Sequence, residues 1–235
     1  MSRLIFDIET VGENFDSLDE TTQEVLQAWI KKEATNEEEF QAELAQLKDG
    51  LGFSPLTGEI VAIGMFDYDR DRGAVYYQAP GEKNADFEEG NISFKQMTER
   101  EMIEQFWKAG SHYDEFVTFN GRQFDAPFLA VRSAIHKIKP TQDLMEGRYL
   151  YQQRKCRHID LFDQLTFYGA MRKKGGLHLW ARAFGIKSPK AGGVTGDDVA
   201  RLFKEKKYKD IARYNVGDLH ATKELYGYWE KYLKA

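Results

Sequence analysis

Short runs of apolar residues with alternating polar neighbours recur along the chain and predict β-strands. The first run begins at residue 3, and its apolar positions 4, 6 and 8 share one face of the strand. The opposite face carries Asp7 and Glu9. A turn-rich segment joins the second run to the third, so these two strands are expected to be antiparallel. The strands are predicted over residues 3–10, 59–66, 74–78, 116–119 and 159–161.

Apolar residues three and four positions apart predict helices over much of the remaining chain. The order of elements, three early strands and then helices alternating with strands, predicts an α/β fold with a mixed five-stranded sheet flanked by helices. We expect a single domain over residues 1–235, with an acidic helical insertion over 15–50 and a polar loop over 79–97. The main helices are predicted over residues 21–32, 36–50, 98–107, 126–136, 177–184, 195–204 and 209–232.

Composition narrows the class of protein. With 235 residues, 42% of them hydrophobic, the chain can bury a substantial core. No apolar run approaches the roughly 20 residues of a membrane-spanning helix, and the first residues do not resemble a secretory leader. Cys156 is the only cysteine, which excludes a disulfide framework and a paired-cysteine zinc site. We therefore expect a cytoplasmic protein that does not enter the membrane.

The net charge of −5 is unevenly distributed along the chain. Residues 11–52 contain eleven acidic and three basic residues, a balance of −8, so the rest of the chain carries +3. Local patches matter more than the total, and this charge is therefore compatible with a nucleic-acid partner. For the acidic helices we favour a solvated cover over the sheet edge rather than a partner-binding surface.

Asp7 and Glu9 are the first candidates for chemistry. They would emerge side by side at the carboxyl end of a strand that is expected to be buried. Burying two carboxylates is costly unless a cation or hydrogen bonds compensate them. A divalent metal with oxygen ligands would compensate both. The alternative is a solvated strand end that carries two ordinary acidic residues.

Two later segments carry further candidates. The fourth strand ends at Asn120, and a turn leads to Phe124 and Asp125, where a helix is predicted to begin. Asp125 suits two roles, the N-cap of that helix or a ligand. In the last helix, Tyr214 and Asp218 are four residues apart and share one face.

Together these segments resemble three motifs of the DEDD 3′–5′ exonucleases, in the variant with Tyr in the last motif. The motifs are Asp7-x-Glu9, Asn120-x-x-x-Phe124-Asp125 and Tyr214-x-x-x-Asp218. The resemblance is closest to predicted stand-alone exonucleases related to the proofreading domain of family B DNA polymerases, to which the stretches 158–163 and 190–196 are also similar. It extends over nearly the whole chain except the acidic segment.

The resemblance implies an RNase H-like fold and two divalent cations, Mg²⁺ or Mn²⁺, that clamp the attacking and leaving oxygens of an in-line displacement. Asp7 would contact both metals. Glu9 and Asp218 would complete the site of the metal that holds the nucleophilic water, and Asp125 would support the other. Tyr214 would orient that water, because a phenol with a pKa of about 10 is a poor base at neutral pH.

The resemblance also implies that Thr10, Asn120 and Phe124 lie where they contact the substrate, with the aromatic ring available for base stacking. The implied function is release of nucleoside monophosphates from the 3′ end of single-stranded nucleic acid, with DNA favoured over RNA. Two alternatives stay open: an exoribonuclease of the same superfamily, and a catalytically silent module that binds nucleic acid.

Aromatic and basic residues also gather between positions 149 and 174, where phosphate contact and simple solvent exposure are equally compatible with the sequence. They comprise Tyr149, Tyr151, Arg154, Lys155, Arg157, Arg172, Lys173 and Lys174. Four histidines show no metal-ligand spacing and are expected to be structural: His112, His136, His158 and His178. His220 follows Asp218 by two residues, so it should point elsewhere. Asp160 and Asp163 suit two roles, support of the metal ligands or helix capping, and capping is favoured.

Overall fold

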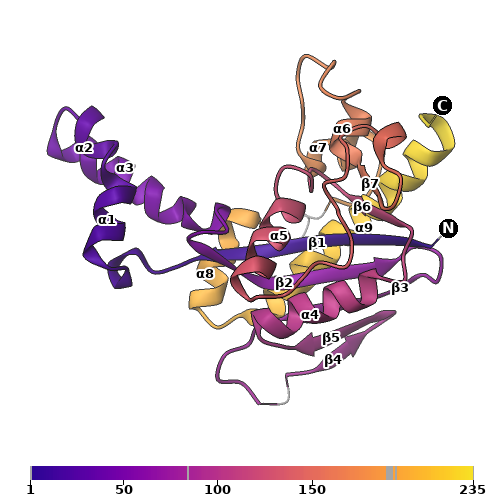
Figure 1. Ribbon diagram of the computed structural model, residues 1–235, viewed down its shortest axis with the longest axis horizontal. Coiled ribbons are helices and arrows are strands. Elements are labelled where there is room, and N and C mark those ends of the chain that lie inside the picture. The colour runs from indigo at the N-terminus through magenta and orange to yellow at the C-terminus, as the bar shows by residue number, and fades with distance from the viewer. Residues whose placement is uncertain (1, 84, 189–192, 194, 235) are drawn as a thin grey trace.

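The computed structural model describes residues 2–83, 85–188, 193 and 195–234. This part of the chain is built on a mixed seven-stranded sheet of order β4-β5-β3-β2-β1-β6-β7 (Figure 1). β1 lies inside the sheet, antiparallel to β2 and parallel to β6. The strands are β1 (Arg3–Gly12), β2 (Gly58–Asp67), β3 (Arg72–Tyr77), β4 (Phe87–Glu89), β5 (Ile92–Gln96), β6 (Glu115–Thr118) and β7 (Arg157–Asp160).

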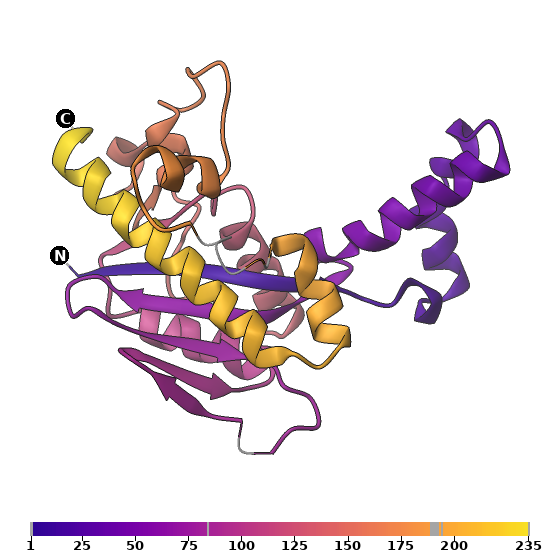
Figure 2. The same cartoon turned by 180° about the vertical axis from the view of Figure 1, so that it is seen from behind.

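Helices cover both faces of the sheet. α4 and α5 pack on one face, while α9 crosses the other with α6, α7 and α8 beside it (Figures 1 and 2). None of the helices in the described ranges has the length and apolar character of a membrane span. The helices are α1 (Glu20–Gln27), α2 (Ile30–Glu33), α3 (Glu37–Gly50), α4 (Glu99–Gly110), α5 (Asp125–Ile135), α6 (Leu161–Leu165), α7 (Leu177–Ala183), α8 (Val199–Lys204) and α9 (Tyr208–Tyr232), with short 3₁₀ turns η1 (Phe15–Ser17), η2 (Leu51–Phe53), η3 (Leu150–Gln152) and η5 (Gly196–Asp198).

β1 shows the alternation that its sequence predicts. Its apolar positions 4, 6 and 8 belong to the core beneath α4 and α5, whereas Ile5 belongs to the core beneath α9. Asp7 and Glu9 accordingly face α9, where both accept hydrogen bonds from Asn215. The strand therefore presents its two acidic side chains to the helix that carries the last motif.

The sheet has two strands more than the five predicted, all five of which are present. β4 and β5 form a hairpin in the segment predicted as a polar loop. β4 carries one apolar residue, Phe87, so its sequence lacks the alternation that marks the other strands. The Phe87 ring stacks on Phe94 of β5 with centroids 4.1 Å apart, and β5 pairs with β3. Tertiary packing rather than local pattern forms this edge.

The acidic segment forms an arm, residues 13–50, that comprises η1, α1, α2 and α3. The arm projects away from the sheet (Figures 1 and 2), so the predicted cover over the sheet edge is wrong. The edge strands are β4 and β7, whereas the arm connects β1 and β2 inside the sheet order. The helix predicted over residues 21–32 is broken into α1 and α2, and Ile30 at the start of α2 is fully buried.

Candidate active site

β1 and β6 stop pairing just before the acidic residues of β1. Their parallel register ends at Ile5 and Val117. Beyond this point the N–H of Ile8 donates a hydrogen bond to Oδ1 of Asp125, at 3.0 Å. Asp125 is the first residue of α5, and the N-cap position belongs to Phe124. Of the two roles open to Asp125, capping is therefore excluded, and its buried carboxylate instead faces the gap between the two strands.

Asp7, Glu9 and Asp218 converge beside this gap. One carboxylate oxygen from each lies within 4.8 Å of the others. The strand supplies two of these residues and α9 supplies the third. A bulge in the pairing of β1 with β2 directly follows Glu9, and bulges often redirect strands next to functional sites. The structure thus brings together three of the four expected metal ligands and leaves Asp125 outside that tight group.

Burial and mutual repulsion act together on these carboxylates. Burial, followed by the charges of Asp125, Asp218 and Glu9, raises the pKa of Asp7 well above its usual range. Burial and then Asp218 raise the pKa of Glu9 in the same way. Burial raises the pKa of Asp125 to about 7. Among the described residues, no ion pair involves Asp7, Glu9 or Asp125.

A divalent cation fits this arrangement. Carboxylate oxygens are the ligands that Mg²⁺ and Mn²⁺ prefer, and three residues offer them within 4.8 Å of one another. A cation would also relieve the repulsion that raises the pKa of Asp7 and Glu9. The group contains neither histidine nor cysteine, so it does not resemble a structural zinc site.

Asn215 is a member of the site that motif spacing did not reveal. Its side chain is fully buried, and its Nδ2 donates to Oδ2 of Asp7 at 2.8 Å and to Oε1 of Glu9 at 3.3 Å. Its Oδ1 has no hydrogen-bond partner in the described part of the chain, which costs about 1–3 kcal/mol for a buried acceptor. The amide therefore orients the two carboxylates at some expense of stability. The one sequence signal is a polar residue next to Tyr214 on a helix face that is mostly apolar.

Gly64 makes room for that amide. It lies on β2 directly opposite Asp7. A Cβ atom at position 64 would lie 1.8 Å from Oδ1 of Asn215 and 2.7 Å from a methyl carbon of Leu219. Both neighbours are fully buried and have little space to withdraw. The glycine thus lets α9 approach β1 closely enough for Asp218 to join Asp7.

Tyr214 lies one helical turn before Asp218 and is partly buried. Burial, followed by the charges of Asp218, Glu9 and Asp7, raises the pKa of its phenol far above the usual value. A hydrogen bond with Asp218 acts in the same direction. At neutral pH the phenol therefore keeps its proton, so it can donate a hydrogen bond but cannot act as a base.

Asp160 shapes the turn that leads from β6 to Asp125. Its carboxylate accepts hydrogen bonds from the N–H groups of Asn120 at 2.8 Å, Arg122 at 2.9 Å and Phe162 at 2.9 Å. The last of these confirms the predicted cap of α6. The other two hold Asn120 in a left-handed conformation, with φ of 65°, while its buried Oδ1 has no partner among the described residues. The capping predicted for Asp163 is wrong, because Asp163 lies inside α6 and its carboxylate pairs with Arg148 instead.

Phe124 has an aromatic neighbour that its sequence context did not predict. Its ring centroid lies 6.4 Å from that of Phe53, a residue of η2 that is 64% exposed. η2 packs on the end of β1, where Oγ1 of Thr10 donates to the carbonyl of Gly52 at 2.7 Å. The Thr10 hydroxyl is therefore engaged by the protein. Because the arm separates Phe53 from β1 in sequence, only the fold reveals that the two aromatic rings meet.

His158 and His220 have contacts typical of structural residues. Buried His158 lies 2.9 Å from both Oγ1 of Thr118 and the carbonyl of Leu144, and burial lowers its pKa to about 4. His220 packs its ring against Phe66, with centroids 5.4 Å apart. Part of the stretch 190–196 that resembles the family falls outside the described residues.

Two comparisons with known proteins agree with this geometry. Residues 74–232 match a family described as predicted 3′–5′ exonucleases related to the exonuclease domain of PolB. The chain belongs to this family. It is accordingly an enzyme of the 3′–5′ exonuclease class. The matched region contains Asp125, Tyr214 and Asp218 but begins after β1, so the inclusion of Asp7 and Glu9 in the site rests on the geometry described above.

The exonuclease is also similar in structure to a family B DNA polymerase from the hyperthermophilic archaeon Pyrobaculum calidifontis, with a TM-score of 0.57 and 18% sequence identity. The similarity covers 99% of this chain and 24% of the polymerase, so the exonuclease spans about a quarter of that protein. This likeness confirms the predicted RNase H-like fold. No curated protein is significantly similar to the exonuclease in sequence.

Proposed function

We propose that the chain is a metal-dependent exonuclease that removes nucleoside monophosphates from the 3′ end of single-stranded DNA. The observation that carries the proposal is the convergence of Asp7, Glu9 and Asp218 at one end of β1, where the first two form no ion pair with any residue that the structure describes. Buried carboxylates repel a polyanionic strand unless added cations neutralise them. A module that only binds nucleic acid gains nothing from such a group, whereas a metal-dependent nuclease requires it.

Two divalent cations, Mg²⁺ or Mn²⁺, would be held by Asp7, Glu9, Asp125 and Asp218. Asp7 is the best candidate for a ligand of both, because the charges of the other three carboxylates all raise its pKa. When bound, the cations would supply charge neutralisation at the phosphate and a lowered pKa of water. Asn215 would keep Asp7 and Glu9 in one orientation through its two hydrogen bonds.

Tyr214 would position the attacking water. Its raised pKa keeps the proton on the phenol, and its hydrogen bond with Asp218 places the hydroxyl beside a proposed ligand. Because its one proton is directed to Asp218, the phenol oxygen would accept a hydrogen bond from the water without taking its proton. This role is one of orientation, which distinguishes Tyr214 from the carboxylates.

Substrate contacts would come from the turn after β6 and from η2. The unpartnered Oδ1 of Asn120 would accept a hydrogen bond from the terminal nucleotide. Phe124 would stack on its base, and Phe53 would extend that apolar contact. Thr10 would contact the strand through its backbone, because its hydroxyl already donates to Gly52.

The test is hydrolysis of a 5′-labelled single strand with Mg²⁺ or Mn²⁺. A ladder of products shortened one nucleotide at a time is expected, with no product in the presence of a chelator. A circular single strand should remain intact, and its cleavage would identify an endonuclease instead. An RNA strand of the same sequence tests the preference for DNA, which rests on the family relationship.

We place this activity in one domain and in the cytoplasm, in keeping with a single buried cysteine.

A further inference from the structure

A second surface with the chemistry of nucleic-acid recognition lies between residues 149 and 173. We call it the aromatic–basic surface, and it comprises Tyr149, Tyr151, Arg154, Phe167, Tyr168, Arg172 and Lys173. Tyr151 is 81% exposed and Phe167 is 60% exposed. The rings of Tyr149 and Tyr151 are nearly parallel, with an interplanar angle of 9° and centroids 5.7 Å apart. Tyr168 adjoins them, 4.7 Å from Tyr149.

The backbone holds these rings in place. Phe167 and Tyr168 are consecutive residues in the left-handed region, with φ of 51° and 54°, a conformation that aromatic residues rarely adopt. Two backbone hydrogen bonds maintain it, from Tyr168 to the carbonyl of Asp163 at 2.6 Å and from Met171 to the carbonyl of Thr166 at 3.1 Å. The strained turn directs Phe167 to solvent and Tyr168 toward Tyr149. An ordinary surface loop has no need of such strain.

The charge of this region is opposite to that of the chain as a whole. Residues 148–182 contain eight basic and two acidic residues, a balance of +6 in a chain of −5. Some of these cations serve the fold, since Arg148 pairs with Asp163 and Arg157 pairs with Glu115. Others are exposed and form no ion pair with any residue that the structure describes: Arg154, Arg172 and Lys173.

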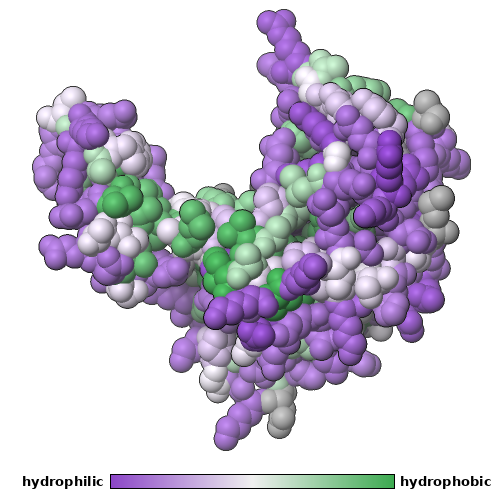
Figure 3. All heavy atoms as spheres, viewed as in Figure 1, coloured by the Kyte–Doolittle hydropathy of each residue, from purple (hydrophilic) through white to green (hydrophobic). Residues whose placement is uncertain are grey.

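Hydrogen bonds and an ion pair connect this surface to the candidate active site. Asp160 holds the turn that carries Asn120. Three residues later, Asp163 forms an ion pair with Arg148, at 2.8 Å. Arg148 directly precedes Tyr149 in the sequence. The surface therefore adjoins the site on the side of β7. The arm lies on the other side of a hollow that separates it from the upper part of the molecule (Figure 3).

We propose that the aromatic–basic surface binds the unpaired strand upstream of its 3′ end. Stacking on aromatic rings tolerates any base, and the exposed cations would contact backbone phosphates, a combination typical of sites for single strands. Tyrosine and arginine are also enriched at protein interfaces, so a protein partner is the alternative that unchanged strand binding in the variants below would favour. The proposal rests on the proposed function, to which it adds a binding surface beyond the terminal nucleotide.

The test compares a long and a minimal substrate for three variants of the full chain. The aromatic variant carries Tyr151→Ala and Phe167→Ala. The basic variant carries Arg154→Ser, Arg172→Ser and Lys173→Ser. The control carries Tyr228→Ala and Tyr232→Ala, which removes two other exposed tyrosine rings whose centroids are 6.0 Å apart near the end of α9. Fluorescence anisotropy reports binding of a 20-nucleotide oligo(dT), and turnover is measured on a thymidine dinucleotide.

For the aromatic variant we expect roughly tenfold weaker binding of the 20-mer, with dinucleotide turnover unchanged. For the basic variant, the slope of log affinity against log salt should fall by about two, since each lost phosphate contact contributes about 0.7 for single strands. The control should match the wild type. Unchanged 20-mer binding in both variants, or an equal loss on both substrates, would overturn the proposal. Absence of hydrolysis with intact 20-mer binding would instead count against the proposed function alone.

Discussion

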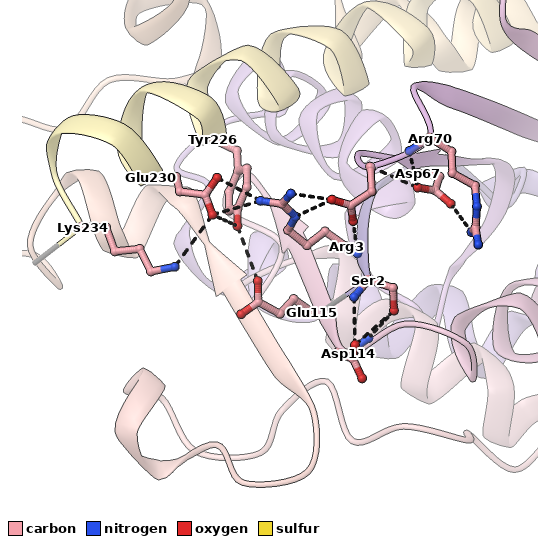
Figure 4. A network of polar contacts seen from close by, with 10 residues as sticks. Ser2, Arg3, Asp67, Arg70, Asp114, Glu115, Tyr226, Glu230 and Lys234 are labelled. Carbon is pink, nitrogen blue, oxygen red and sulfur yellow. Dashed lines mark hydrogen bonds and ion pairs between the residues drawn. The ribbon is translucent and has the colours of Figure 1, made fainter.

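The two ends of β1 accommodate charge in opposite ways. At the amino end of β1, the guanidinium of Arg3 pairs with the carboxylates of Asp69 and Glu230. Its Nη1 lies 2.9 Å from Glu230 (Figure 4). At the carboxyl end of β1, Asp7 and Glu9 accept hydrogen bonds from a neutral amide, and burial together with neighbouring carboxylates raises the pKa of both. One end is a balanced network, and the other retains repulsion.

This difference separates a structural use of charge from a functional one. The network at the amino end joins β1 to the last turns of α9 through Glu230, and the nearby Glu115 is paired with Arg157 at 2.7 Å. Charges there stabilise the fold without help. The repulsion at the carboxyl end of β1 is relieved by protonation or by a bound cation, so that end is expected to contribute activity rather than stability.

The largest effect on activity is expected from a substitution at the carboxyl end of β1. Asp7→Ala should reduce Mg²⁺-dependent hydrolysis to background, yet leave the free energy of unfolding of the metal-free protein unchanged or higher, because one repelling charge is gone. Turnover and urea unfolding of the same preparation measure both. Near-wild-type turnover would show that Asp7 is not a metal ligand. A large loss of stability would remove the contrast between the two ends.

Two variants on one face of α9 should separate orientation of the attacking water by Tyr214 from metal coordination by Asp218. Tyr214→Phe is expected to lower turnover by about 10²–10³-fold, as for the loss of one transition-state hydrogen bond, with Mn²⁺ affinity close to normal. Asp218→Asn should instead weaken Mn²⁺ binding, because it removes a charged ligand. Calorimetric titration with Mn²⁺ beside turnover distinguishes the two. Rescue of Tyr214→Phe by raised Mn²⁺ would contradict the role given to Tyr214.

Two polar contacts between α9 and β1, one at Arg3 and one at Asn215, should respond differently to substitution. Arg3→Met is expected to lower the free energy of unfolding by about 1.5–3 kcal/mol, through lost hydrogen bonds to charged groups, without changing Mn²⁺ affinity. Asn215→Ala should weaken Mn²⁺ binding by about 10–100-fold with a smaller loss of stability. Thr222→Val, which alters another buried polar residue of α9, serves as the control. Equal Mn²⁺ affinities in all three variants would show that Asn215 does not orient the carboxylates.

The free energy of unfolding should fall with rising pH because of the carboxylates at the carboxyl end of β1. The pKa of Asp125 is raised in the fold to about 7, so the folded state keeps its proton longer than the unfolded chain does. Its contribution is fully present below about pH 4 and is lost as the pH rises through 7. Asp125→Asn, which retains an acceptor for Ile8, should flatten the decline between pH 5 and 8, whereas exposed Asp49→Asn should not. Urea unfolding in the presence of a chelator, repeated across this pH range, measures the decline. Identical slopes of unfolding free energy against pH in the wild type and Asp125→Asn would refute the raised pKa of Asp125.

The smallest effect is expected from the arm. Its −8 balance should weaken single-strand binding at low salt by no more than about fivefold, since exposed charges contribute little. Replacing Glu24, Glu33 and Glu38 by Gln should tighten binding. The gain should fade above 0.1 M salt, where charges more than about 10 Å apart are screened from one another. Matched Gln replacements at Glu82, Glu88 and Glu224 provide the control. If both sets act equally, only the net charge matters and the arm has no local influence.

Local pattern was sufficient to predict β1 and the elements that carry the motifs. The alternation in β1 placed Asp7 and Glu9 on one face, and the four-residue spacing placed Tyr214 beside Asp218. The edge hairpin was missed because β4 depends on one stacked ring, Phe87 on Phe94, rather than on alternation.

Contacts between distant segments could not be predicted in the same way. Asn215 acts through β1, some 200 residues earlier in the chain, and Phe53 meets Phe124 only because η2 packs on the end of β1. Asp160 was expected to cap α6, and its further hold on the turn at Asn120 depends on the parallel pairing of β6 with β7. Each of these depends on the register of the sheet, which no local pattern encodes.

The contact between Gly64 and Asn215 has a consequence for the evolution of the family. With a Cβ at position 64 only 1.8 Å from the amide oxygen, the two positions cannot change independently. A lineage that acquires alanine at 64 must first shorten residue 215 or move the helix, and either route abandons the bridge between the two carboxylates. Among related sequences, glycine at 64 and asparagine at 215 should therefore be inherited as a pair. Frequent occurrence of that asparagine beside a larger residue at 64 would show that the helix can be accommodated in some other way.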